Sequence, residues 1–129
     1  MNGQDLNFSY NKSPGYAIIT KSEGKQRLDF ASGSLEEDNP HTALFSILMD
    51  SFVVGNEVDA TDPAENKSFI MFQTKDVVST ISGKIKIDRV GQKAGDYFEI
   101  SASGKIISIY DKKEIGNITE MKVKVYRGN

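Results

Sequence analysis

The chain lacks cysteine altogether and has a single histidine, His41. Without cysteine there are no disulfide bonds, thiolate nucleophiles, zinc–thiolate sites or iron–sulfur clusters. One histidine cannot build a multi-histidine metal site, and no spacing of serine and aspartate around it indicates a catalytic triad. Because His41 follows Pro40 in the stretch EEDNPHTA, we expect a solvated loop residue there, with a hydrolase built on His41 as the alternative.

An excess of one charge and long apolar runs are also missing. The net charge is -2 and the isoelectric point is near 5.4, which argues against a surface that binds nucleic acid or an anionic membrane. No apolar run approaches the roughly 18 residues that a transmembrane helix needs. The length of 129 residues, with 38% hydrophobic and 26% charged residues, fits one ordinary globular domain.

The N-terminal stretch MNGQDLNFSYNKSPG has neither a basic region nor an apolar region, so it is not a signal peptide. Either the protein is cytoplasmic, or the chain begins after an export signal that has been removed. Absence of cysteine does not decide between the two, since bacterial envelope proteins often lack it as well. We expect residues 1–15 to be a flexible segment and residues 16–129 to form a single all-β domain.

Alternation with a period of two residues is the strongest pattern in the chain. In residues 81–89 the odd positions up to Ile87 are apolar or small and the even positions are polar. Residues 98–106 alternate in the same way with the even positions apolar or small, and residues 121–126 with the odd positions apolar. Such alternation predicts strands with one buried face. The phase changes after Ile106, which predicts a β-bulge or bend near residues 104–107.

Strands are also expected in the first half of the chain. Residues 16–20 and 26–32, separated by KSEGK, predict a hairpin, and residues 68–74 predict a further strand. Residues 43–55 are almost continuously apolar, which fits a fully buried strand or a short helix; the strand formers FVV near their end favour a strand. About seven or eight short strands predict an antiparallel β-sandwich, immunoglobulin-like or a related Greek key, with a closed lipocalin-like barrel as the alternative.

The sequence GQKAG, from Gly91 to Gly95 with Lys93 inside it, resembles a phosphate-binding loop at first sight. Such a loop requires a helix immediately after it, whose N-terminus faces the anion. The residues that follow, DYFEISAS, alternate with a period of two instead, and no lysine followed by serine or threonine completes the motif. We therefore predict a hairpin turn in which glycine accepts a positive φ angle.

Three tyrosines are the candidate ligand-binding residues. By the phase of their strands, Tyr97 and Tyr126 point away from the core, and Tyr110 lies just beyond the phase change. Outward tyrosines can stack on sugars or line a contact with another protein. The structural alternative is a cross-strand aromatic pair that only stabilises the sheet.

Two groups of acidic residues stand out in the expected loops. One is Glu36, Glu37 and Asp38, and the other lies in the long connection formed by residues 55–66. Calcium prefers six to eight oxygen ligands, so Asp59, Asp62 and Glu65 are candidate calcium ligands. The calcium-binding motif D-x-D-x-D-G is absent, and Pro63 restricts the path of the chain. A charged surface loop is therefore the alternative. No other metal and no cofactor is expected.

The segment ISGKIKIDRVGQKAGDYFEISASGKI resembles a recurring hairpin in small envelope lipoproteins of Gram-negative bacteria, and residues 118–127 resemble their closing strand. This resemblance implies an all-β mature domain in the periplasm or on the cell surface. The family has no assigned activity, so the resemblance implies no catalytic residue. A lipid anchor would have been lost from this chain, which has no cysteine to carry one. The matching residues are Ser82, Gly83, Ile85, Ile87, Val90, Gly91, Gly95, Tyr97, Phe98, Glu99, Ser103 and Gly104.

Three hypotheses about function follow from these patterns. The first is a non-enzymatic domain with a binding or structural role at the cell envelope, which holds a glycan or a protein partner on one sheet face or on its loops. The second is a lipocalin-like carrier, in which residues 43–54 and 68–72 line a cavity that holds an apolar ligand. The third is a hydrolase that uses His41 or two loop carboxylates. None of them involves nucleic acid.

Overall fold

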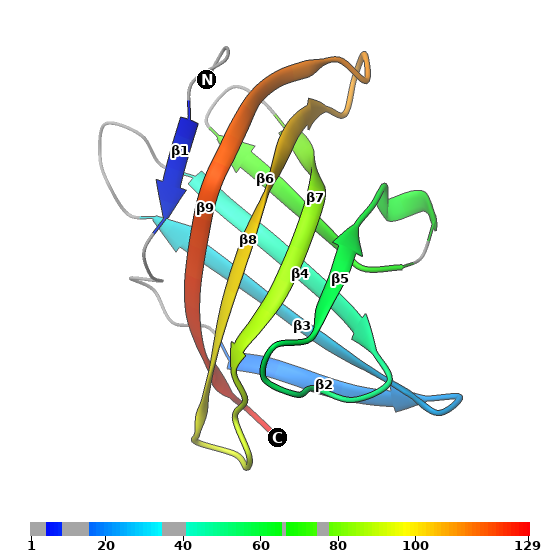
Figure 1. Cartoon of the computed structure of the whole chain (residues 1–129), viewed down its shortest axis with the longest axis vertical. Coiled ribbons are helices and arrows are strands. Elements are labelled where there is room, and N and C mark those ends of the chain that lie inside the picture. Colours follow the sequence, from blue (N-terminus) through cyan, green and yellow to red (C-terminus); the bar gives the residue numbers. More distant parts are fainter. Residues whose placement is uncertain (1–4, 9–15, 35–40, 66, 75–77) are drawn as a thin grey trace.

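The computed structural model confirms an all-β protein (Figure 1). It describes residues 5–8, 16–34, 41–65, 67–74 and 78–129, and in these ranges there is one 3₁₀-helix, η1 (Pro63–Glu65), and no α-helix. The strands are β1 (Asp5–Phe8), β2 (Tyr16–Ser22), β3 (Lys25–Ser34), β4 (His41–Met49), β5 (Glu57–Ala60), β6 (Phe69–Thr74), β7 (Val78–Arg89), β8 (Tyr97–Ser108) and β9 (Glu114–Arg127).

All nine strands belong to one mixed sheet. Antiparallel pairing runs from β2 through β3, β4, β6, β7 and β8 to β9. Strand β9 then pairs in parallel with β2, so the pairing returns to where it began. Strand β5 pairs with β7, and β1 pairs in parallel with β9. The prediction of a purely antiparallel sheet is thus wrong for two pairs, because β9 meets β1 and β2 from the opposite end of the chain, where no tight turn fixes the direction.

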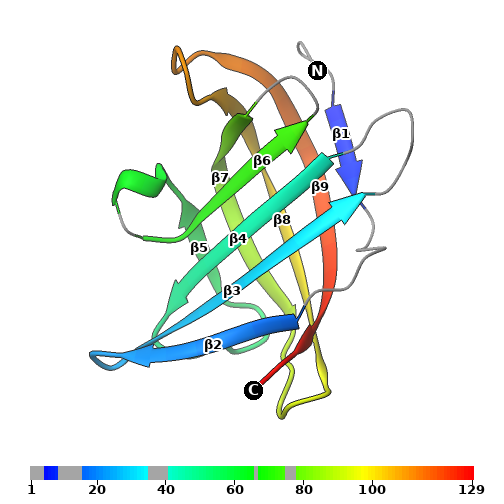
Figure 2. The same cartoon turned by 180° about the vertical axis from the view of Figure 1, so that it is seen from behind.

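The strands lie in two layers that cross each other obliquely. Strands β7, β8 and β9 run side by side in one layer, with β1 and β5 at its edges, and β2, β3, β4 and β6 form the other layer (Figures 1 and 2). The apolar core lies between the layers, because each long strand alternates buried and exposed residues. The largest fully buried side chains are Phe45, Phe72, Phe98, Leu28, Ile47, Ile70, Ile81, Ile85, Ile87, Ile100, Ile106 and Ile118.

Most strands expected from the periodicity are confirmed. Strands β7, β8 and β9 cover the three alternating segments, and β2 and β3 form the predicted hairpin with Glu23 and Gly24 at positive φ in its turn. The pairing of β8 with β9 shifts register between Ala102 and Gly104 and again between Ile106 and Ile107. In both shifts the extra residue lies on β9, whereas β8 pairs with β7 without a shift here and keeps Ile106 and Ser108 buried. The change of phase and the bulge predicted for this strand are therefore wrong, because the bulges belong to its partner β9.

Several local predictions differ from the structure. Residues 43–55 do contain a strand, but β4 ends at Met49 and the FVV segment that favoured it lies in the following turn. Strand β4 begins at His41, so this residue belongs to a strand and not to a loop as predicted, while residues 35–40 lie outside the described residues. Strand β5 interrupts the loop predicted for residues 55–66, and β1 forms in the segment predicted to be flexible. Both strands have only four residues, too few for a clear alternation. Glu36, Glu37 and Asp38 lie outside the described residues.

Two glycines face each other where β7 and β8 come closest. Gly83 and Gly104 are register partners. A methyl group on Gly83 would overlap the carbonyl oxygen of Ser103, and one on Gly104 would overlap that of Ser82 and lie 2.8 Å from the Cα atom of Gly83. Gly104 also has a φ of 153°, which side chains rarely accept. The two Ser-Gly pairs, Ser82-Gly83 and Ser103-Gly104, therefore mark a place where the backbones of β7 and β8 approach each other closely.

Candidate functional site

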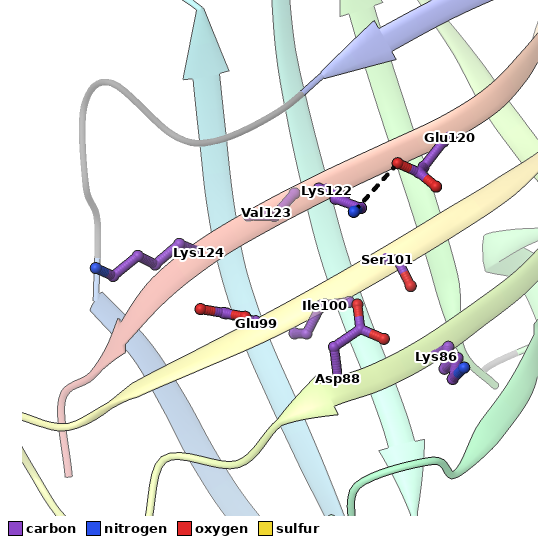
Figure 3. Close-up of a pocket in the computed structure, with 9 residues that line it drawn as sticks. All are labelled: Lys86, Asp88, Glu99, Ile100, Ser101, Glu120, Lys122, Val123 and Lys124. Carbon is purple, nitrogen blue, oxygen red and sulfur yellow. Dashed lines mark ion pairs between the residues drawn. The ribbon is translucent and has the colours of Figure 1, made fainter.

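A pocket of about 510 Å³ lies on the outer face of β7, β8 and β9, away from the core (Figure 3). It contains three carboxylates, three lysine ammonium groups and one serine hydroxyl. Ile100 and Val123 also border it, although their side chains are buried on the inner face. The pocket is therefore almost entirely polar. Its lining residues are Lys86, Asp88, Glu99, Ile100, Ser101, Glu120, Lys122, Val123 and Lys124.

The pocket exists because side chains of different length stand next to each other across three strands. Ser101 on the middle strand β8 is the register partner of Lys86 on β7 and of Lys122 on β9. The short serine leaves a depression between the two long lysines (Figure 3). All three point outward because they share one phase of the two-residue alternation.

A β-bulge at Asp88 shapes one side of the pocket. The pairing passes from Ile87 opposite Ile100 directly to Arg89 opposite Glu99, so Asp88 is the extra residue. As a result Asp88 lines the pocket, while Arg89 also turns outward and lies over Tyr97. Bulges commonly redirect side chains in this way. The alternation gives no sign of this bulge, since Asp88 itself keeps the polar phase.

Among the described residues, three of the six charged side chains make neither an ion pair nor a contact with an aromatic ring. Glu120 pairs with Lys122, with 3.4 Å between the carboxylate oxygen and the ammonium nitrogen (Figure 3). The Lys124 ammonium lies 4.2 Å from the centroid of the Tyr97 ring. Within the described part of the chain, no ion pair or side-chain hydrogen bond engages Lys86, Asp88 and Glu99. Their donors and acceptors are available to a ligand.

A second, smaller hollow of about 170 Å³ adjoins the first on the side of β5. The two share three lining residues, Lys86, Ser101 and Glu120. The smaller hollow is also polar, and its further lining residues are Glu57, Lys84, Ala102, Ser103 and Thr119.

The structure brings together two of the three candidate tyrosines. Tyr97 and Tyr126 are register partners on β8 and β9, with ring centroids 6.1 Å apart and an angle of 63° between the ring planes. Tyr110 is 78% exposed, in the turn after the other end of β8, roughly 35 Å along the strand at 3.3 Å per residue. The three tyrosines thus do not form one site.

Two cations already lie against the ring of Tyr97. The guanidinium carbon of Arg89 lies 3.6 Å from the centroid of the ring, and Lys124 lies over the same ring. Cation–π contacts of this kind stabilise the side-chain arrangement. A sugar that stacks on Tyr97 would have to displace one of these cations, so the cross-strand aromatic pair is the arrangement that the geometry favours for Tyr97 and Tyr126.

The loop between β7 and β8 is a turn, as predicted, and not a phosphate-binding loop. Gly95 has a φ of 91°, and the chain continues into β8 instead of a helix. Asp96 organises the turn by accepting hydrogen bonds from the backbone N–H of Gln92 at 3.0 Å, from that of Tyr97 at 2.9 Å and from Arg89 at 3.0 Å. These hydrogen bonds lower the pKa of Asp96 from 3.8 to about 2, with the Gln92 N–H as the largest cause.

Replacing Asp96 by asparagine is expected to make stability less dependent on pH in acid. A carboxyl group whose pKa is lower in the folded protein stabilises it fully above its unfolded pKa of 3.8 and loses this effect as the pH falls through about 2. The melting temperature of Asp96→Asn should therefore lie below that of the unmodified protein at pH 7, and the gap should close between pH 4 and pH 2. Thermal melts across this range measure it, with Asp111→Asn in the opposite turn as the control. A difference in melting temperature that stays the same from pH 4 to pH 2 would contradict the lowered pKa of Asp96.

Two of the three candidate calcium ligands, Asp59 and Asp62, are engaged with lysines. Asp59 forms an ion pair with Lys84, which raises the pKa of Lys84. Asp62 accepts a hydrogen bond from the Ala64 N–H at 3.0 Å, which is the main cause of its lowered pKa, and lies 3.4 Å from the Lys112 ammonium. In the ranges that the structure describes, no three His, Cys, Asp or Glu residues are grouped as metal ligands. The side chain of His41 lies outside the described part.

Comparison with known proteins yields no relative from which a function could be transferred. No protein-family model, no curated protein and no solved structure matches the chain. Among the described residues, no helix has the length and apolar character needed to cross a membrane. The pocket on β7, β8 and β9 is therefore the feature from which a function is inferred.

Proposed function

We propose that this protein is a non-enzymatic binding domain that holds a glycan in the pocket on β7, β8 and β9. The observation that carries the proposal is the composition of the pocket: three carboxylates, three ammonium groups and a serine hydroxyl border one hollow. Each sugar hydroxyl both donates and accepts hydrogen bonds, so carboxylates and ammonium groups can engage it together. Lys86, Asp88 and Glu99 can do so without breaking any ion pair seen in the described structure.

A glycan fits this surface better than a protein partner does. The centres of protein interfaces are rich in aromatic residues and poor in lysine, glutamate and aspartate. The pocket has the opposite composition, with six such charged residues and no aromatic ring in its lining. Its three positive and three negative side chains balance, which suits a neutral ligand and not a polyanion such as nucleic acid.

The pocket also lies apart from His41, the residue on which the hydrolase hypothesis rests. His41 begins β4, which belongs to the opposite layer of the sheet (Figure 1). The pocket faces outward from the layer of β7, β8 and β9. A general base must lie within hydrogen-bond reach of the reacting group. The backbone of β4 belongs to the layer that does not form the pocket, which favours binding over hydrolysis as the role of this site.

The continuous strand pairing supports the closed barrel, the alternative architecture expected from the sequence, more than the sandwich. In a lipocalin-like carrier the interior of such a barrel would be left open for an apolar ligand. Here Phe45, Phe72 and Phe98 are fully buried between the two layers together with isoleucines from both. These side chains occupy space that a carrier would offer, so the outer pocket is the better candidate for ligand binding.

A location in the periplasm or on the cell surface accompanies this proposal. The resemblance of residues 81–106 to a hairpin of envelope lipoproteins supports it. Fractionation of the producing cells tests it directly, because recovery of the protein in the cytoplasmic fraction alone would contradict an envelope role.

Replacing Glu99 by glutamine is expected to weaken glycan binding about tenfold, because a hydrogen bond to a charged acceptor contributes about 1.5 kcal/mol and is lost or weakened. A glycan array identifies ligands of the unmodified protein, and isothermal titration calorimetry compares the variants. Glu65→Gln, on the exposed helix η1, is the matched control and should bind like the unmodified protein. Equal affinity of Glu99→Gln, or no bound glycan on the array, would contradict the proposal.

A further inference from the structure

The two adjoining hollows follow the direction of β8. Ser101, which borders both, and Ser103, which borders only the smaller one, are successive outward residues of this strand. Outward residues two positions apart are separated by roughly 6.6 Å. The polar depression therefore continues past Ser101, with a second set of side chains at the next outward position.

Each hollow has its own hydrogen-bonding groups beside the three that both share. The larger hollow has Asp88, Glu99 and the lysines of β9. The smaller one has the hydroxyls of Ser103 and Thr119 and the charged groups of Glu57 and Lys84. The ion pair with Asp59 fixes the Lys84 ammonium beside this hollow. A ligand unit in either hollow would thus find donors and acceptors of its own.

We infer that the two hollows are neighbouring subsites for an oligosaccharide that lies along β8 with at least one sugar unit in each. This inference rests on the proposed glycan binding and deepens it, since it specifies a chain and not a single sugar. The shared residues Lys86, Ser101 and Glu120 stand at the junction of the subsites, where they meet the linkage between two units. Binding should therefore strengthen with each unit added until both hollows are filled.

Two serine substitutions distinguish ligand binding in both hollows from binding in the smaller hollow alone. Ser101→Tyr places a bulky ring in both hollows, whereas Ser103→Tyr fills only the smaller one. Both positions point outward on a strand, where tyrosine is a favourable residue, and circular dichroism with thermal melts checks that each variant folds. The probes are β-1,4-linked oligomers of N-acetylglucosamine and of glucose with one to six units, measured by isothermal titration calorimetry.

The unmodified protein is expected to bind one of these series at least tenfold more tightly as the chain grows, and then to reach a plateau. Ser101→Tyr should lose at least tenfold in affinity at every length. Ser103→Tyr should bind the shortest ligand like the unmodified protein but gain nothing from further units. Should Ser103→Tyr fail to fold, Thr119→Tyr tests the same hollow from β9.

Two outcomes would overturn the two subsites and leave the proposed function standing. One is an affinity that does not change with the length of the oligomer. The other is a Ser103→Tyr variant whose affinity rises with oligomer length as much as that of the unmodified protein. Unchanged binding by both Ser101→Tyr and Glu99→Gln would instead overturn the proposed function, because ligand would then be bound elsewhere. No binding of any oligomer in either series would overturn the two subsites, and an array without any bound glycan would overturn the proposed function as well.

Discussion

Replacing Gly104 by alanine is expected to lower the free energy of unfolding by about 3 kcal/mol, because the added methyl group overfills a tightly packed contact. In the structure this group would overlap the carbonyl oxygen of Ser82 and come within 2.8 Å of the Cα atom of Gly83. Both obstacles are backbone atoms, which cannot rotate away as a side chain would. The φ of 153° at Gly104 adds strain for any residue with a Cβ atom.

Chemical denaturation of Gly104→Ala measures this loss. Gly83→Ala should lose a similar amount, since its methyl group would overlap the Ser103 carbonyl oxygen and lie 2.6 Å from the Cα atom of Gly104. The control is Ser103→Ala, an exposed neighbour on β8, where a change of no more than about 0.5 kcal/mol is expected. If both glycine variants lose less than about 1 kcal/mol, β7 and β8 do not approach each other this closely.

Replacing Phe98 by alanine is expected to lower the free energy of unfolding by about 3–5 kcal/mol, the range for a phenylalanine removed from a core. Phe98 is fully buried on β8 and meets Phe52 edge to face, with ring centroids 6.0 Å apart. Its ring also lies against Gly91 of the turn. The substitution therefore leaves a cavity where the turn, β8 and the segment after β4 meet.

Denaturation of Phe98→Ala next to Phe98→Leu separates the cavity from other effects. Leucine fills much of the volume of the phenylalanine ring, so the free energy of unfolding of Phe98→Leu should fall by about 1.5 kcal/mol. A loss for Phe98→Ala no larger than that for Phe98→Leu would show that the ring is not enclosed as described. Circular dichroism at 25 °C establishes that both variants are folded at the start of the titration.

The alternation of residues was sufficient to predict most of β7 and β8 and the second half of β9, and to assign the inward and outward faces of these segments. This worked because a strand places successive side chains on opposite faces, so the pattern depends only on local geometry. Strands β1 and β5 could not be predicted in the same way. They have four residues each and are held by β9 and β7, partners that no local pattern identifies.

The candidate site was only partly predictable. Tyr97 and Tyr126 were assigned to the outer face, but the sequence does not contain the information that Arg89 and Lys124 lie over the Tyr97 ring. All six charged residues that line the larger pocket were recognised as polar positions of strands and not as one group. They come from three strands and meet only through the register of those strands.

The sequence by itself determined that this protein is all-β, that its three C-terminal strands each have one buried face, and that GQKAG is a turn. Tertiary structure alone decided that the strand pairing returns from β9 to β2, that Gly83 faces Gly104, and that the bulge at Asp88 directs two successive charges outward. The physical reason is the range of the interactions. Alternation and turn preference act between residues a few positions apart, whereas register is set by hydrogen bonds between strands that are distant in the chain.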